Sequence, residues 1–176
     1  MKLDLVCNKS DEHYTPKFAI KPIMKYLKPN SYIWCPFDTK ESNYVKLFTE
    51  AGHNVICTHI DNGVDFFKYN YSNIDIDYII SNPPYSLKTE VLQRLFEINI
   101  PFAMLVGVVG LFESQKRFDM FKNNKFEIMY FNKRVSYMKD YTSNKLELNP
   151  PFSSVYVCHN ILTQQIVFEE INKKDI

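Results

Sequence analysis

The sequence predicts an α/β fold in which a mostly parallel sheet is flanked by helices and ends in an antiparallel C-terminal hairpin. In the first two thirds of the chain, apolar strand patterns alternate with helical patterns, as in sheets whose strands are joined by helical crossovers. The last third is rich in strand patterns, which would add antiparallel strands at one edge. A chain of 176 residues is expected to form a single domain, residues 1–176.

The expected elements follow one another without a linker or an internal repeat. The first helix begins beside Pro16, which suits a first helical turn, and Pro22 shortens or kinks it. Asp38-Thr39 would cap the second helix, and Ser86 or Thr89 the third. Helices are expected at 17–27, 41–51, about 86–98 and 113–124, and strands at 31–37, 54–60, 77–81, 101–109, 126–131, 154–159 and 165–169.

The composition excludes several classes of protein. A hydrophobic fraction of 45% supports a folded core, and a net charge of +1 excludes a basic nucleic-acid coat. The four cysteines form no CxxC pair and no cluster at metal spacing, so neither a metal site nor a disulfide scaffold is expected. The first residues lack the apolar core of a signal peptide, and the longest apolar run, 101–112, falls short of the roughly 20 residues that span a bilayer. We therefore expect a cytoplasmic protein with no membrane partner.

The most informative stretch is DYIISNPPY at 77–85. An apolar strand ends at Asn82, and open α/β sheets bind ligands at the carboxyl ends of their strands. Pro83 and Pro84 stiffen the loop and offer no backbone donors, which leaves neighbouring carbonyl groups available. Together with the flat ring of Tyr85, the Asn82 amide and these carbonyls form a receptor for a planar group that bears an NH₂. A structural Pro-Pro turn is the alternative interpretation.

Asn-Pro-Pro-Tyr at 82–85 resembles motif IV of the adenine-specific amino-methyltransferases that use S-adenosyl-L-methionine (SAM). The resemblance covers about 14–169 and implies a Rossmann-like SAM-methyltransferase fold, in a compact DNA adenine methyltransferase of the phage or mobile-element type. Such an enzyme transfers a methyl group from SAM to the exocyclic amine of adenine, without a general base or a metal. The resemblance assigns catalysis to Asn82, Pro83, Pro84 and Tyr85. The Asn82 oxygen and the Pro83 carbonyl would accept N–H bonds from the amine, and Tyr85 would stack on the flipped base.

The loop after the first expected strand departs from the family pattern. Family members have [DE]-x-F-x-G-x-G there, whereas this chain reads CPFDTKE at 35–41. Phe37 matches, but a cysteine replaces the acid, and Thr39 and Glu41 replace the glycines, which allow close approach of the backbone to a ligand. Asp38 would supply the carboxylate from the neighbouring position, or it would only cap the helix.

Other parts of the cofactor site follow from the same resemblance. Tyr14-Thr15-Pro16 resembles motif X, which contacts the methionine part of SAM, and Asp65-Phe66 resembles the pair that binds its adenine ring. His59 or Asp61 lies where a ribose-binding acid is common. The expected cofactor-binding residues are Tyr14, Thr15, Pro16, Pro36, Phe37, Asp38, His59, Asp65, Phe66 and Asn82.

The charge is distributed unevenly along the chain. The segment 114–145 has eight Lys and Arg against three Asp and Glu, with aromatic residues between them. Basic groups contact phosphates and aromatic rings stack on bases, so the loop 132–152 is the expected nucleic-acid contact. The expected contact residues are Lys88, Lys133, Arg134, Tyr137 and Lys139.

The order of the motifs, with the cofactor loop before NPPY, matches the γ arrangement of adenine methyltransferases, which usually have a separate target-recognition domain. No such domain is expected here, so a partner protein or a second copy of the chain would supply sequence recognition. A second Asn-Pro-Pro-Phe at 149–152 is interpreted as a decoy, because a charged stretch at 144–147 precedes it. Three alternatives remain open: an RNA adenine substrate, a glutamine amide of a protein, and a nucleic-acid-binding relative that has lost SAM.

Overall fold

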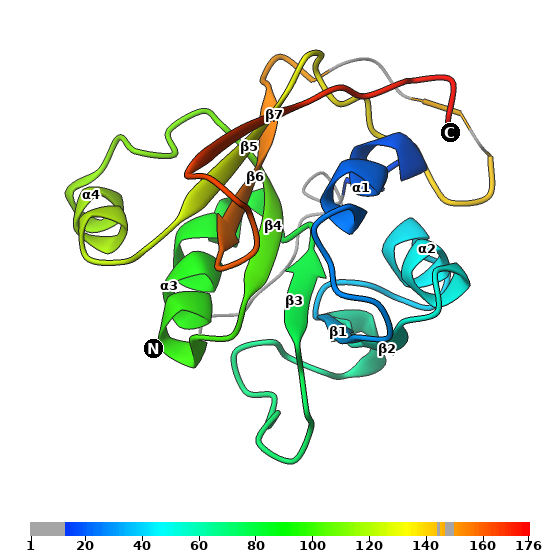
Figure 1. Cartoon of the computed structure of the whole chain (residues 1–176). Coiled ribbons are helices and arrows are strands. Elements are labelled where there is room, and N and C mark those ends of the chain that lie inside the picture. Colours follow the sequence, from blue (N-terminus) through cyan, green and yellow to red (C-terminus); the bar gives the residue numbers. More distant parts are fainter. Residues whose placement is uncertain (1–12, 144, 147–149) are drawn as a thin grey trace.

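The computed structural model describes residues 13–143, 145–146 and 150–176. Seven strands form one sheet in the order β2-β1-β3-β4-β6-β5-β7 (Figure 1). The strands are β1 (Tyr32–Cys35), β2 (Asn54–Cys57), β3 (Tyr78–Ser81), β4 (Phe102–Gly107), β5 (Glu127–Phe131), β6 (Ser154–His159) and β7 (Ile166–Glu169). The helices are α1 (Lys17–Met24), α2 (Asn43–Glu50), α3 (Lys88–Ile98) and α4 (Gln115–Lys122), with short 3₁₀ helices η2 (Ile60–Asn62) and η3 (Tyr85–Leu87).

The pairing of the strands confirms the predicted fold class. β1 runs parallel to β2 and β3, and β3 runs parallel to β4. β6 is antiparallel to both of its neighbours, β4 and β5, and β7 runs parallel to β5. The expected hairpin implied that the last two strands, β6 and β7, pair with each other. They do not, because β5 lies between them and is the antiparallel partner of β6. β6 is buried along its whole length, as a central strand should be, whereas β7 alternates exposed and half-buried residues at the sheet edge.

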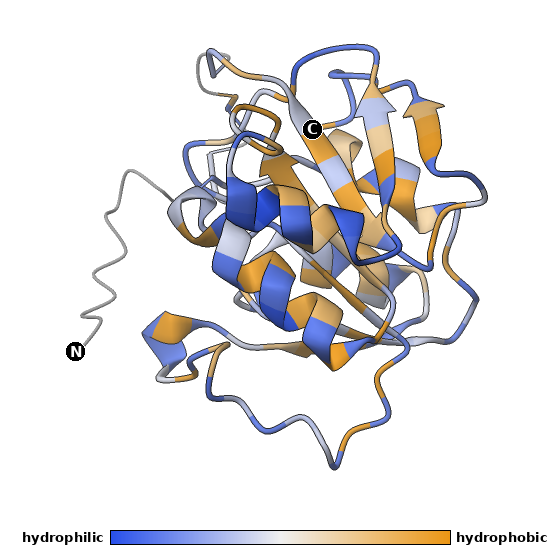
Figure 2. Ribbon diagram, turned by 90° about the vertical axis from the view of Figure 1, so that its left-hand side faces the viewer, coloured by the Kyte–Doolittle hydropathy of each residue, from blue (hydrophilic) through white to orange (hydrophobic). Residues whose placement is uncertain are grey.

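Helices cover both faces of the sheet (Figure 1). α1 and α2 pack on one face, where their apolar side chains join those of Ile33, Ala103 and Leu105 in one buried cluster. α3 and α4 pack on the other face, against Trp34 and Met104. Alternate residues of β1 and β4 therefore enter opposite cores, which is the period-2 geometry of a strand. Figure 2 shows mostly hydrophobic strands behind helices that combine hydrophilic and hydrophobic residues.

The helix caps differ from the sequence prediction at two places. Ser42 caps α2, and its hydroxyl accepts a hydrogen bond from the backbone N–H of Val45. Asp38-Thr39 does not cap this helix, because the Asp38 carboxylate is hydrogen bonded to Ser81. Leu87 is the N-cap residue of α3, without a side-chain hydrogen bond, because the 3₁₀ turn η3 leads directly into the helix. Pro22 lies within α1, which ends at Met24, earlier than expected.

No helix in the described part of the chain is long and apolar enough to cross a membrane. Cys35, Cys57 and Cys158 are free thiols. The N-terminal stretch that was compared with a signal peptide lies outside the described residues.

Candidate active site

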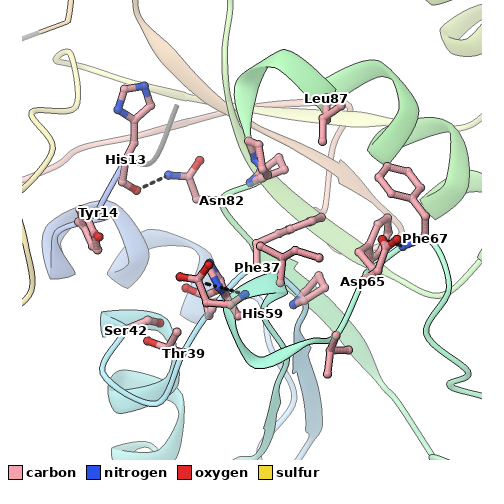
Figure 3. Close-up of a pocket in the computed structure, with 18 of the residues that line it drawn as sticks. His13, Tyr14, Phe37, Thr39, Ser42, His59, Asp65, Phe67, Asn82 and Leu87 are labelled. Atoms are coloured by element: carbon pink, nitrogen blue, oxygen red, sulfur yellow. Dashed lines mark hydrogen bonds and ion pairs between the residues drawn. The ribbon is translucent and has the colours of Figure 1, made fainter. Parts of the chain in front are cut away.

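A cavity lies at the carboxyl ends of β1, β2 and β3, where the loops after these strands meet the N-terminal segment (Figure 3). Parallel strands end at the same edge of a sheet, so residues far apart in sequence converge there. The predicted cofactor or catalytic residues that line the cavity are Tyr14, Pro36, Phe37, Asp38, His59, its alternative Asp61, Asp65, Phe66, Asn82, Pro83 and Pro84. Sequence reasoning missed His13, Thr39, Ser42, Ile60, Val64, Phe67, Leu87 and Tyr141, which also line it.

The side chain of Asn82 has one satisfied end and one unsatisfied end. Its Nδ2 donates hydrogen bonds to the backbone carbonyl of His13 at 2.8 Å and to Thr15 Oγ1 at 3.1 Å (Figure 3 shows the first). Its Oδ1 is buried and accepts no hydrogen bond from the described residues. An unpaired buried acceptor costs about 1–3 kcal/mol, and an N–H group from a ligand would remove this cost.

Tyr85 lies outside the cavity lining, in an aromatic cluster that we define as His13, Tyr85, Tyr137 and Phe152. The rings of Tyr85 and His13 have centroids 4.8 Å apart, and those of Tyr85 and Phe152 are 5.5 Å apart. The hydroxyl of Tyr85 is hydrogen bonded to that of Tyr137, which also bonds Ser154 Oγ at 2.7 Å. Tyr137 is only 3% exposed, so the expected contact between Tyr137 and nucleic acid is corrected: this residue supports Tyr85 from within the protein.

Phe152 belongs to the second Asn-Pro-Pro-Phe, which was interpreted as a decoy. Its ring lies beside that of Tyr85, while Asn149 lies outside the described residues. Gly107, at the end of β4, leaves room for this contact, because a Cβ there would be 3.2 Å from Phe152 Cδ2. The sequence contained the motif, but nothing local indicated that its phenylalanine would meet Tyr85.

Asp38 provides a buried carboxylate at the cavity. Its side chain is bonded to Ser81 Oγ at 2.5 Å, and its backbone N–H donates to the carbonyl of Thr58 at 3.1 Å. Burial raises the pKa of Asp38 to about 6, although hydrogen bonds from Ser81 and Ser42 partly oppose the shift. At neutral pH this carboxyl is largely ionised, so the cavity contains a negative charge with little solvent around it.

The wall formed by the loop after β2 is partly apolar and partly polar. Phe66 is almost fully buried, its ring centroid lies 4.9 Å from that of Phe37, and the Arg94 guanidinium lies over it at 5.4 Å. Asp65 accepts a hydrogen bond from the backbone N–H of Phe67 at 2.9 Å. His59 Nδ1 accepts a hydrogen bond from the backbone N–H of Asp61 at 3.1 Å. This wall offers a flat apolar surface beside carboxylate and imidazole groups.

Thr15 and Pro16 are buried and do not line the cavity. Thr15 bonds the Asn82 amide, and its backbone carbonyl accepts a hydrogen bond from Asn43 Nδ2 at 3.0 Å. The expected contact of these two residues with a cofactor is therefore corrected: neither lines the cavity, and Thr15 instead holds Asn82, which does. Pro16 has the extended backbone of the N-cap residue of α1.

The expected nucleic-acid residues other than Tyr137 lie at or near the surface. Lys133, Arg134 and Lys139 are exposed. The first two follow β5, which runs in the direction of β4, so they lie at the same edge of the sheet as Asn82. Lys88 is half-buried, and its Nζ donates to the backbone carbonyl of Val109 at 2.6 Å. Burial, followed by the charge of Arg117, lowers the pKa of Lys88.

No family model matches the chain, and no curated protein has a significant sequence match to it. Its fold is similar to that of a protein from Vibrio vulnificus YJ016, described as a modification subunit of a type I restriction enzyme. The match has a TM-score of 0.52 and 11% sequence identity, and covers 93% of this chain. The chain spans about half the length of that protein, 48%.

A second solved structure to which this chain is similar is that of the tRNA (m1A58) methyltransferase TrmI from Aquifex aeolicus. It has a TM-score of 0.45 and 12% identity, and the match covers 89% of this chain and 72% of that one. The first likeness, at so low an identity, establishes the fold only, so function has to be argued from the site itself.

Proposed function

We propose that the protein is a SAM-dependent methyltransferase that modifies the exocyclic amine of adenine in DNA. The observation that supports this most directly is the Asn82 side chain, which has an unpaired buried Oδ1 at a cavity beyond the end of β3. An acceptor in this position suits an N–H group of a substrate. The adjacent Pro83 also lines the cavity, and its backbone carbonyl would be the second acceptor.

The residues of the cavity fit SAM, which would supply an electrophilic methyl group attached to a positively charged sulfur. The ionised Asp38 carboxylate attracts the positive amino group of the methionine part. The rings of Phe37 and Phe66 would pack against the adenine ring of SAM, and Asp65 would accept a hydrogen bond from the adenine amine. His59 would bond the ribose hydroxyls.

Methyl transfer to an adenine amine requires its lone pair, which is delocalised into the ring. The Asn82 oxygen and the Pro83 carbonyl accept the two N–H bonds, favour a pyramidal nitrogen, and stabilise the positive charge that develops there. Holding the nitrogen in line with the methyl group would provide proximity. The nitrogen–carbon bond would form as the sulfur–carbon bond of SAM breaks, which leaves a neutral thioether, and the methylated amine would release one proton to solvent. Tyr85 stacks on the flipped base, which requires the His13 ring to move because it packs on Tyr85.

Nucleic acid is the substrate class that the charge distribution favours over a glutamine amide of a protein. Lys133 and Arg134 are exposed at the edge of the sheet that contains Asn82, and Lys139 is exposed further along the same loop. These groups are suited to phosphates, which position a nucleic acid without reading its sequence. We further propose that sequence recognition depends on a partner protein or on a second copy of the chain.

A second candidate is a nucleic-acid-binding relative that no longer uses SAM. It is favoured by the loop after β1, where Thr39 lines the cavity at a position that is glycine in the resembled family. The first candidate predicts that the protein binds SAM, and the second predicts that it does not.

The test has two stages. Calorimetric titration with SAM is followed by transfer of a tritiated methyl group to AT-rich DNA and to bulk tRNA, with the wild type and Asn82→Ala. We expect binding of SAM by both proteins and transfer to DNA by the wild type alone. Label on tRNA alone would move the substrate to RNA, and normal turnover by Asn82→Ala would refute the mechanism. Absence of SAM binding with or without nucleic acid would favour the second candidate.

A further inference from the structure

We infer that Thr15 is a positioning residue, which acts together with the His13 carbonyl to hold the Asn82 amide so that only its oxygen is presented to the substrate. The inference rests on the proposed function for its catalytic consequence, but the contact itself is independent of it. Both N–H groups of Asn82 Nδ2 are used within the protein, one on the His13 carbonyl at 2.8 Å and the other on Thr15 Oγ1 at 3.1 Å. The oxygen accepts nothing from the described residues.

The His13 carbonyl fixes which end of the amide points toward it, and the Thr15 hydroxyl occupies the second N–H group. A backbone carbonyl only accepts hydrogen bonds, so the nitrogen of Asn82 must face His13. Rotating the amide by half a turn would place the Asn82 oxygen against the His13 carbonyl oxygen and break that bond, whereas the Thr15 hydroxyl would then donate to the oxygen instead. In the observed orientation, Oδ1 alone of the amide atoms remains for an incoming N–H group. This matters for catalysis, because an inverted amide would offer a donor to an amine that needs an acceptor.

Thr15 is itself held rigidly. Its side chain is 0% exposed, and a β-branched residue has few accessible χ1 states. Its backbone carbonyl accepts from Asn43 Nδ2 on α2 at 3.0 Å, and the neighbouring Tyr14 carbonyl accepts from the Met138 N–H at 2.8 Å. The segment 13–15, which contacts Asn82, is thus also held by hydrogen bonds from α2 and from Met138.

The position of Thr15 separates this role from cofactor binding. Tyr14 lines the cavity, but Thr15 does not. Removing the Thr15 hydroxyl should therefore loosen the hold on the Asn82 amide, which keeps its bond to the His13 carbonyl, while leaving the surface that meets SAM unchanged. Thr15→Val keeps the volume and shape of the side chain and removes the acceptor, whereas Thr15→Ser keeps the hydroxyl.

The first readout does not depend on activity. In ¹⁵N-labelled protein, the two side-chain amide protons of Asn82 are assigned by their absence in Asn82→Ala, and their exchange with solvent is measured. We expect slow exchange in the wild type and in Thr15→Ser, and exchange at least about tenfold faster in Thr15→Val, which has lost one of two hydrogen bonds. Unchanged protection in Thr15→Val would overturn the inference.

The second readout is methyl transfer, with Thr89→Val as the matched control. Thr89 is also a buried threonine whose hydroxyl takes part in one hydrogen bond, with Arg117, but it lies outside the cavity. We expect kcat to fall about tenfold in Thr15→Val, with the Kd for SAM within about twofold of wild type, and near-normal kcat in Thr15→Ser and Thr89→Val.

Three outcomes of the second readout would contradict the inference. They are a parallel loss of SAM affinity in Thr15→Val, an equal loss of kcat in Thr15→Ser, and full kcat in Thr15→Val. Melting temperatures of all variants show whether a loss reflects unfolding, and Thr15→Ser keeps the test valid if Thr15→Val does not fold. Protected amide protons in a wild type that transfers no methyl group would leave the Thr15 contact standing and refute the proposed function.

Discussion

The carboxylate of Asp38 and the hydroxyl of Ser81 are joined by a hydrogen bond of 2.5 Å. Asp38 follows β1 and Ser81 is the last residue of β3, directly before Asn82. One buried contact thus joins the loop expected to hold the cofactor to Ser81, the residue directly before Asn82, which is expected to bind the substrate amine. A change in the charge of Asp38 should therefore affect both the binding of the cofactor and the position of Asn82.

The first prediction concerns stability. The pKa of Asp38 is raised from 3.8 to about 6, so the folded chain binds this proton more tightly than the unfolded chain. The stability from this group is therefore complete below about pH 4 and is lost as the pH rises through about 6. We expect Asp38→Asn, which removes the buried charge, to raise the melting temperature relative to wild type at pH 8, and by less at pH 5. An equal effect at both pH values would contradict the assignment.

The second prediction concerns the cofactor. Protonation of Asp38 removes the negative charge from the cavity, so the affinity of the wild type for SAM should fall as the pH decreases through about 6. In Asp38→Asn the affinity at pH 8 should be lower by on the order of tenfold and should change little with pH. Calorimetry at pH 5.5 and pH 8 measures both. Asp119→Asn, an exposed carboxylate on α4, is the control and should bind SAM as wild type does.

The third prediction concerns the packing of Gly107. An alanine Cβ there would lie 3.2 Å from Phe152 Cδ2, which is tight enough that the Phe152 ring must shift by a few tenths of an ångström, and 3.5 Å from Tyr85 Cε2, an ordinary contact. Gly107→Ala should lower the free energy of unfolding by about 1–3 kcal/mol in urea titrations and should reduce methyl transfer. Adding Phe152→Leu to Gly107→Ala should recover part of the stability. A Gly107→Ala protein as stable and as active as wild type would show that Phe152 does not pack there.

The fourth prediction separates support of Tyr85 from contact with nucleic acid. Tyr137→Phe removes a hydroxyl that is bonded to Tyr85 and Ser154, so it should cost about 1–2 kcal/mol in the free energy of unfolding. Because Tyr137 is buried, the affinity for nucleic acid should not change. Tyr130→Phe, on β5, is the control and should be near wild type in both measurements. A loss of nucleic-acid affinity at full stability would restore Tyr137 as a contact.

The fifth prediction concerns phosphate contacts. Arg134→Ala should weaken binding to DNA of different sequences to a similar extent and should reduce the slope of log K against log salt by about 1. Lys28→Ala provides the control, because Lys28 is exposed before β1, at the opposite edge of the sheet. Fluorescence anisotropy at several salt concentrations measures the slope. An unchanged slope in Arg134→Ala would remove this residue from the phosphate contacts.

The strands and the NPPY loop were predictable from local sequence because their signals are local. β3 and β4 are buried on both faces and read as continuous apolar runs, and the prolines at 83–84 end the pattern abruptly. The carboxyl ends of parallel strands share one edge, so the meeting of Phe37 and Asn82 at one cavity also followed from the predicted topology.

Some roles within that edge did not follow from local signals. Asp38 precedes a helix and has the chemistry of a cap, yet it bonds Ser81 on another strand and leaves the cap to Ser42. Tyr137 lies among basic residues as a surface aromatic would, yet it is inside the aromatic cluster. Each residue type permits both roles, and long-range packing selects between them.

By itself, the sequence determined the α/β class, the approximate elements and the chemical groups at the ends of β1 and β3. Only the tertiary structure decided that the segment 13–15 holds Asn82, that Phe152 meets Tyr85, and that β5 separates β6 from β7. The physical reason is that propensity and periodicity act over a few residues. Contacts such as Thr15 with Asn82 join residues 67 positions apart, and they form only when packing of the whole chain offsets the entropy of closing the intervening loop.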